Sequence, residues 1–159
     1  LMVTGDKYTE KQKLLHEILE VEVPANQREI AFALSLGDLR ENAEYKAAKE
    51  KQDELNAKVA KLKNEIERAQ IFDKSTVSSS KIAFGTETIL KNELSGEEER
   101  YVILGPWESN PSHNIISYLS PLGMALWDHR PGEELSFTIN QNEFQYTVEA
   151  VEKADLKSL

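Results

Sequence analysis

A long helical run is the feature that most constrains how this chain can fold. Neither glycine nor proline occurs between Glu44 and Gln70, and apolar side chains recur there at alternating steps of four and three, at Leu55, Val59, Leu62, Ile66 and Ala69. This spacing is a heptad seam and predicts a helix about 40 Å long at about 1.5 Å per residue. One helix cannot bury such a seam alone, so the chain must supply a partner.

The segment before this helix provides that partner. Thr9 and Gln12 fit a capping box, and apolar or small residues follow at Leu14, Ile18, Val21, Ala25, Ile30, Ala33 and Leu34. We expect a kink or break at Pro24, because proline inside a helix lacks a hydrogen-bond donor and clashes with the preceding turn. The helix then restarts at Asn26. Residues 35–42 form the tip, and so short a connection makes the two helices antiparallel neighbours.

Composition changes after Asp73. Five of the seven glycines and four of the five prolines lie beyond it. Residues 74–80 are polar and rich in serine, which is typical of a linker. We therefore expect an N-terminal coiled-coil finger over residues 1–73, a linker over 74–80 and a C-terminal domain over 81–159.

The C-terminal region contains strand-like runs separated by turn residues. They predict strands at Thr86–Lys91, Arg100–Leu104, Asn114–Tyr118, Leu135–Ile139 and Phe144–Val151. The acidic run at residues 97–99 is interpreted as part of a hairpin turn. Ser120 as N-cap with Pro121 at the first helical position predicts one short helix. The predicted fold class is α+β, an antiparallel two-helix hairpin followed by a mainly β domain with one helix.

Composition also excludes several kinds of function. The chain has no cysteine, which rules out disulfides, thiolate zinc sites and thiol catalysis. Its three histidines, His16, His113 and His129, lack the spacing of metal ligands. The net charge of −9 would not draw the protein to bare nucleic acid. No apolar run reaches the roughly 20 residues of a membrane span, so we expect no membrane association.

The predicted tip reads Gly-Asp-Leu-Arg-Glu-Asn-Ala-Glu-Tyr over residues 37–45. This stretch resembles the signature of bacterial Gre transcript-cleavage factors of the GreA type, and all seven defined positions of that signature match. A second stretch, residues 116–126, looks like the C-terminal motif of the same family. The resemblance covers about residues 8–156. It implies an N-terminal coiled coil followed by an FKBP-like α+β domain.

The resemblance also implies a partner and a role. The partner is bacterial RNA polymerase, with the globular domain docked at the rim of its secondary channel, for which the candidate residues are Ser120, Pro121 and Leu122. The finger enters the channel and activates the polymerase's own cleavage of backtracked RNA near the RNA 3′ end. The family's two essential acidic residues fall on Asp38 and Glu41. The implied protein is a cytoplasmic monomer and an accessory factor rather than an enzyme, without a cofactor or a bound metal of its own.

Elementary chemistry explains why two acids would serve this role. Hydrolysis of a phosphodiester with two Mg²⁺ ions requires both ions held and a water oriented, and Mg²⁺ prefers oxygen ligands. Asp38 can therefore ligate a polymerase Mg²⁺, while Glu41, one turn along, shares the ion or orients the water. The alternative is that Asp38 and Glu41 form a helix capping box, and the two roles are compatible.

The remaining candidates have more modest roles. Residues that shape the tip are Gly37, Leu39, Arg40, Asn42, Glu44 and Tyr45, of which Arg40 is also a candidate for phosphate or carboxylate contact. Lys46 and Lys49 are candidates for RNA contact. The same helix face mixes lysines with a similar number of acids, so an ordinary solvated face is the alternative.

Three other functions stay open. A Gre homologue that inhibits in the same channel should have an altered acidic tip. An FKBP-like prolyl isomerase with a coiled-coil arm needs an aromatic pocket, and the C-terminal aromatics look too dispersed for one. A coiled-coil adaptor should dimerise. The chain also departs from the family pattern, since Asp128 and His129 stand where Gly-Lys is usual and Leu34 stands where a basic residue is frequent.

Overall fold

The computed structural model describes residues 1–37 and 42–156, and it divides into two compact units. One unit comprises Tyr8–Ala69, and the other joins Leu1–Lys7 to the chain from Gln70 onward. This grouping differs from the predicted finger of residues 1–73. The reason is a short parallel pairing in which β1 (Met2–Val3) lies beside β2 (Gln70–Ile71), so the first residues belong with the C-terminal unit.

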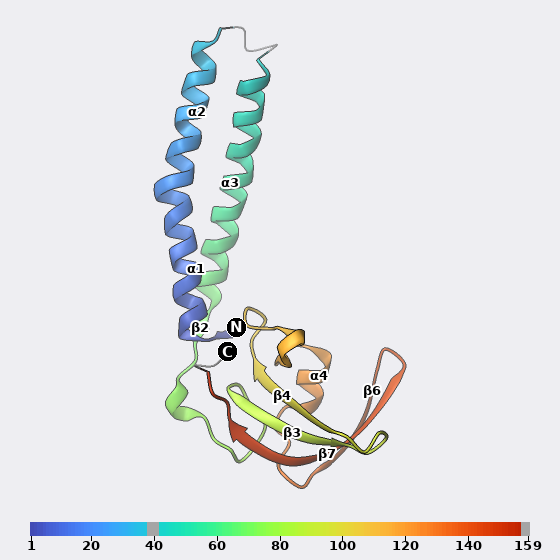
Figure 1. Ribbon diagram of the computed structural model, residues 1–159. Helices are drawn as coiled ribbons and strands as arrows, with labels where there is room; N and C mark the ends of the chain where they lie inside the picture. The colour runs from blue at the N-terminus through green and yellow to red at the C-terminus, as the bar shows by residue number, and fades with distance from the viewer. Residues whose placement is uncertain (38–41, 157–159) are drawn as a thin grey trace. The chain divides into compact units, whose positions relative to one another are not determined.

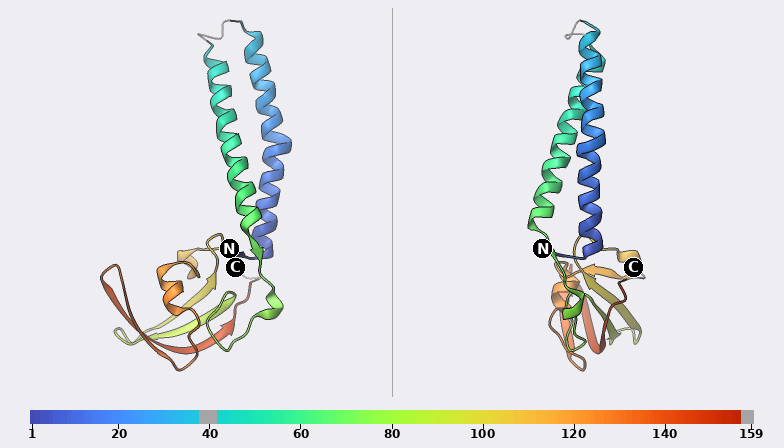
Figure 2. Two further views of the ribbon diagram at one scale, coloured as in Figure 1. Left: turned by 180° about the vertical axis from the view of Figure 1, so that it is seen from behind. Right: turned by 90° about the vertical axis from the view of Figure 1, so that its left-hand side faces the viewer.

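The first unit is the predicted antiparallel helical hairpin. Its first arm runs through α1 (Gly5–Glu17), the π-helical turn η1 (Ile18–Glu22) and α2 (Val23–Ser35). Its second arm is α3 (Ala43–Arg68). The two arms run alongside each other, as Figure 1 and the left-hand view of Figure 2 show.

The first helix begins earlier than predicted. The hydroxyl oxygen of Thr4 accepts the backbone N–H of Lys7 at 3.3 Å, and α1 starts at Gly5. Thr4 therefore satisfies one of the N–H groups that a helix leaves unpaired at its start. Thr9 lies inside the helix, so the capping box predicted there was wrong.

Pro24 is accommodated without breaking the arm. The turn before it is π-helical, and its closing bond runs from the N–H of Val23 to the carbonyl of Ile18, five residues back. A proline near the start of α2 needs no donor there. The expected break at Pro24 is thus a change of helix type within a continuous arm.

The π turn changes which residues face α3. Asn26 is buried at 2% exposure, whereas Leu14 and Val21 are 45% and 57% exposed. The predicted seam was wrong at both positions, for different reasons. Before the π turn it is Leu15, not Leu14, that packs against the buried cluster. At Val21 the π turn takes up about one extra residue and rotates the arm from there on. On α3 the prediction was correct, since its buried residues are Ala48, Leu55 and Leu62.

Packing in the hairpin is uneven along its length. The buried cluster that includes large side chains consists of Ile18, Leu55 and Leu62, with Leu15, Val23 and Val59 packed against it. Nearer the turn, the buried residues are Asn26, Ala33 and Ala48. Small side chains there make few dispersion contacts, so apolar burial stabilises this half less than the other.

The second unit is built on a sheet that, within the described residues, has five strands in the order β5-β4-β3-β7-β6 (Figure 1). The strands are β3 (Thr86–Asn92), β4 (Glu98–Leu104), β5 (Ile115–Ser117), β6 (Glu134–Ile139) and β7 (Asn142–Lys153). Neighbours are antiparallel except β4 and β5. All five predicted strands are confirmed, but residues 98 and 99 begin β4 and are not part of the preceding turn.

Shorter elements complete this unit. The helix α4 (Pro121–Leu126) follows β5 as predicted, and 3₁₀ turns occur at η2 (Lys74–Thr76) and η3 (Pro111–His113). The core combines residues of the sheet with Leu126 of α4, and it comprises Ile82, Leu90, Ile103, Leu126, Leu135, Tyr146, Val148 and Val151. The α+β prediction is confirmed for this unit.

One polar cluster lies on the core face of the sheet. The Oε1 atom of Glu99 accepts hydrogen bonds from the hydroxyls of Tyr101 at 2.7 Å and Tyr146 at 3.0 Å, and its Oε2 accepts from Asn92 at 2.8 Å. Burial opposes ionisation of Glu99, but these three donors outweigh it and lower its pKa. Burial, and then the carboxylate of Glu99, raise the pKa of Tyr101 to about 12 and that of Tyr146 well above its ordinary value.

This cluster predicts an alkaline limit to the stability of the second unit. Above the ordinary tyrosine pKa of 10.0 the unfolded chain loses phenolic protons that the folded cluster keeps. The free energy of unfolding should therefore fall as pH rises from 10 toward about 12. Urea unfolding followed by tryptophan fluorescence measures it, since Trp107 and Trp127 both lie in this unit.

The matched variant is Tyr146→Phe. At neutral pH its free energy of unfolding should be about 1 kcal/mol lower than that of the unmodified chain, because one hydrogen bond is missing. Between pH 10 and 11 its free energy of unfolding should fall less steeply than that of the unmodified chain. Tyr45→Phe, in the other unit, is the control. Parallel pH curves for the unmodified chain and Tyr146→Phe would contradict the assignment.

Candidate functional site at the turn of the hairpin

The nine-residue motif at 37–45 spans the turn between the two arms. Because α2 ends at Ser35 and α3 begins at Ala43, the motif joins the ends of two antiparallel helices, as predicted. Asp38, Leu39, Arg40 and Glu41 lie outside the described residues. The described frame of the site is therefore Gly37 on one side and residues 42–45 on the other.

Asn42 connects both arms at this turn. Its side-chain oxygen accepts the N–H of Tyr45 at 3.0 Å, which makes Asn42 the N-cap of α3. Its amide nitrogen donates to the carbonyl of Ala33 in α2 at 2.6 Å. One side chain thus satisfies a helix start and a helix end. The capping box expected at Asp38 and Glu41 is not the start of α3.

The other described motif residues differ in environment. Gly37 has a φ of +105°, a conformation that residues with a Cβ rarely adopt. Glu44 is exposed in the first turn of α3, where the positive end of the helix favours an acid. Tyr45 is half-buried. Gly37 therefore permits a left-handed backbone at the end of the first arm, and the Tyr45 side chain is partly shielded from solvent.

The predicted RNA-contact candidates lie on the solvent face of α3. Lys46 and Lys49 are both exposed, and the amine of Lys49 donates to the side chain of Gln52 at 2.7 Å. On α2, Leu34 and Phe32 are exposed, as is Leu36 just after the helix. The prediction that Leu34 continues the seam was wrong, for the same change of helical phase that exposes Val21.

Asn26 is the residue of this unit that sequence reasoning missed. It was interpreted only as a helix restart, but it is buried and its amide donates to the carbonyl of Ala48 at 2.9 Å. The sequence did contain a signal for this burial, since Asn26 is a polar residue only two positions after Pro24. The signal could not be used because the hydrophobic steps alone did not reveal the π turn.

The predicted docking residues lie at the start of α4. The hydroxyl of Ser120 accepts the N–H of Gly123 at 3.0 Å and donates to the carbonyl of Ser117 at 2.6 Å. Pro121 is exposed at the first helical position, and Leu122 packs against the core. The Ser-Pro-Leu stretch therefore has one apolar side chain held by the core and a proline exposed to solvent.

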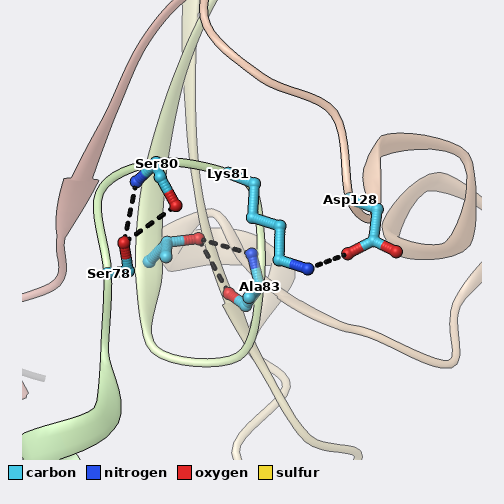
Figure 3. Close-up of polar contacts among 6 residues, drawn as sticks. Ser78, Ser80, Lys81, Ala83 and Asp128 are labelled. Carbon is cyan, nitrogen blue, oxygen red and sulfur yellow. Dashed lines mark hydrogen bonds and ion pairs between the residues drawn. The ribbon is translucent and has the colours of Figure 1, made fainter.

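The turn after α4 contains Asp128 in a left-handed conformation. This residue has a φ of +68°, a left-handed conformation that Asp tolerates better than most residues with a Cβ. Its backbone N–H donates to the carbonyl of Ile82 at 2.9 Å, and its carboxylate pairs with the Lys81 amine at 3.0 Å (Figure 3). Figure 3 also shows the hydrogen bonds between Ser78 and Ser80 in the segment before Lys81.

The aromatic residues of this unit are less dispersed than expected. The rings of Phe137 and Phe144 stack at 5.4 Å, and both lie about 6 Å from Tyr146, at 6.0 and 6.1 Å. Tyr146 is buried, and the two phenylalanines pack against the same core. The expected dispersal was wrong, and the gathered rings contribute to the core of the unit.

The described part of the chain has neither a metal-binding cluster nor a helix that could span a membrane. Among residues 1–37 and 42–156, no group of three or more His, Asp or Glu side chains is arranged to hold a metal ion. Over the same residues, the helices are too short or too polar to cross a bilayer.

Comparison with known proteins assigns both parts of the chain to one family. Residues 1–71 match the family model for the N-terminal domain of a transcription elongation factor, and residues 77–153 match the GreA/GreB C-terminal model. Transcription elongation factor GreA of Treponema pallidum (strain Nichols) is 51% identical over 156 residues, or 98% of this chain and 96% of the relative.

More distant relatives have the same description. Transcription elongation factor GreA of Sulfurovum sp. (strain NBC37-1) is 36% identical over 146 residues, which is 92% of this chain and 90% of the relative. Among solved structures, that of GreA factor homolog 1 of Thermus thermophilus covers 96% of this chain and 98% of its own, at 25% identity and a TM-score of 0.43.

The two hydrogen bonds of Asn42 predict a measurable loss on truncation. Asn42→Ala should destabilise the hairpin by about 1–2 kcal/mol, because the N-cap bond disappears together with the bond to Ala33. Thermal unfolding followed by circular dichroism at 222 nm measures the change. The control is Asn56→Ala, an exposed position inside α3, which should be neutral or slightly stabilising because alanine favours helix. Equal effects of both substitutions would contradict the capping role.

Proposed function

Because the chain belongs to the GreA/GreB family of transcription elongation factors, we propose that its hairpin enters the secondary channel of RNA polymerase and stimulates the polymerase's own hydrolysis of backtracked RNA. The observation that carries the proposal is the complete acidic motif at residues 37–45, placed in the turn between α2 and α3. Arrested complexes with an extruded RNA 3′ end are the substrate of the stimulated reaction.

The chemistry rests on two carboxylates. Asp38 supplies an oxygen ligand to a Mg²⁺ ion held by the polymerase, since carboxylate oxygens are ligands that Mg²⁺ accepts readily. Glu41 accepts a hydrogen bond from the attacking water and so orients it toward the phosphodiester. The polymerase contributes the metal ions and the RNA, so this chain is an activator and not itself an enzyme.

The described residues support the delivery of these acids. Gly37 reverses the chain and Asn42 bonds both helices, so the ends of the intervening segment are held. Lys46 and Lys49 project from the first turns of α3, where they can attract the phosphates of the extruded RNA. Their number is small, and the chain's net charge of −9 leaves recruitment to protein–protein contact.

That contact is proposed for the start of α4. Ser120, Pro121 and Leu122 form a rigid, capped edge next to exposed Leu119 and Met124, which is suited to a partly apolar protein partner. The alternative function is inhibition within the same channel. Inhibition without cleavage needs no metal ligand at the turn, and the presence of both Asp38 and Glu41 favours activation.

The test uses backtracked complexes of polymerase from the same source. The unmodified chain should accelerate RNA cleavage, and Asp38→Asn should lower the stimulated rate by about 100-fold through loss of the ligand charge. The control is Asp53→Asn, an exposed acid elsewhere on α3, which should retain full activity. Asp38→Asn should still compete with the unmodified chain for polymerase.

Two results would reject the proposal. Undiminished stimulation by Asp38→Asn would remove the metal-ligand role. An unmodified chain that binds polymerase and slows cleavage would instead favour the inhibitor.

A further inference from the structure

Among the described residues, the half of the hairpin next to the motif has no large side chain that is fully buried. The buried residues there are Asn26 at 2%, Ala33 at 1% and Ala48 at 6% exposure, whereas Ile18, Leu55 and Leu62 are buried in the other half. Alanine side chains form shallow ridges, so they hold two helices against sliding only weakly. An interaction other than apolar packing must therefore set the axial position of α2 relative to α3 at this end of the hairpin.

Two asparagine side chains make directional contacts across this weakly packed region. Asn26 of α2 donates to the backbone carbonyl of Ala48 in α3 at 2.9 Å. Asn42, at the start of α3, donates to the backbone carbonyl of Ala33 in α2 at 2.6 Å. A backbone carbonyl cannot move independently of its helix. Because sliding by one turn, about 5.4 Å, would carry both acceptors out of hydrogen-bond reach, it would break both bonds.

The π turn is what brings Asn26 to this position. Ile18 and Asn26 are both buried although they are eight residues apart, and eight residues of regular α-helix overshoot two full turns by about 80°. The wider π turn at Ile18–Glu22 absorbs this excess. Beyond it, Asn26 and Ala33 are seven residues apart, the spacing of one heptad. The π turn and Asn26 therefore belong to one arrangement.

We infer that Asn26 is a positioning residue that fixes the axial register of α2 against α3 and thereby the place at which the acidic motif is presented. The inference rests on the proposed function for its consequence in transcription. Its structural basis is independent, since a single buried asparagine can specify the register of a coiled coil at some cost in stability.

Asn26→Leu separates register from stability. The carbonyl of Ala48 lies inside α3, where it also accepts the usual bond from the residue four positions on. Removal of the Asn26 donor therefore leaves no unpaired buried group, while leucine adds apolar burial. The melting temperature and helical content of Asn26→Leu should equal or exceed those of the unmodified chain. The matched control is Asn56→Leu, at an exposed position of α3.

Register is measured without polymerase by electron paramagnetic resonance distances between two nitroxides. The chain has no cysteine, so Arg28→Cys on α2 and Lys51→Cys on α3, both exposed positions, can be labelled cleanly. One narrow distance distribution is expected in the unmodified background and in Asn56→Leu. In Asn26→Leu the distribution should broaden or shift by about 5 Å, the length of one helical turn.

Cleavage gives the functional readout. In Asn26→Leu the maximal stimulated rate should fall about tenfold or more, because displaced carboxylates no longer meet the reacting atoms. The factor concentration that gives half of this rate should stay the same, because docking through the C-terminal unit is untouched. A loss caused by poor folding would instead lower helical content and raise that concentration.

The outcomes separate this inference from the proposed function. An unchanged narrow distribution in Asn26→Leu overturns the inference, and so does a fall in helical content, since Asn26 would then hold the helices together rather than select their register. A wild-type maximal rate with an altered distribution overturns the positioning role. Full activity of Asp38→Asn rejects the proposed function alone, and the distance measurement is unaffected by it.

Discussion

The burial of one apolar seam between two antiparallel arms is the constraint on which the hairpin depends. Neither arm can cover its stripe alone, and Ile18, Leu55 and Leu62 supply the cluster that holds them together. Packing of these residues drives the association of the two arms, but it is confined to one end of the hairpin. At the other end the contacts between the arms are made by alanines and by the hydrogen bonds of two asparagines. Apolar packing in one half therefore holds the arms together, and hydrogen bonds in the other half align them.

The second unit is stabilised in a different way from the hairpin. Within the described residues, a five-stranded sheet and α4 enclose one hydrophobic core. On the core face of the sheet, the carboxylate of Glu99 accepts hydrogen bonds from two tyrosine hydroxyls. Ser120 caps α4, while the Lys81 pair helps to keep Asp128 in a left-handed turn after it. Both ends of the short helix are therefore fixed by polar contacts that cost little to maintain at a surface.

The periodic elements could be predicted from the sequence, but a change of helical phase within an element could not. The heptad of α3 and the alternating pattern of the strands could be recognised because each follows a single period. The motif at residues 37–45 could be recognised because its residues are contiguous. The phase of the first arm could not be read, since a π turn leaves the hydrophobic steps looking regular while it rotates Val21 into solvent. The cap of α3 was misplaced because Asp38 and Asn42 are equally good caps by type, and only the helix boundary distinguishes them.

The pairing of β1 with β2 has a consequence for synthesis. Val3 is fully buried, the N–H of Met2 donates to the hydroxyl of Tyr118, and the N–H of Thr4 donates to the carboxylate of Glu108 at 2.6 Å. These partners lie more than 100 residues further along the chain. Residues 2–4 therefore reach their native contacts only after residues 108–118 have been synthesised, so this part of the fold forms late.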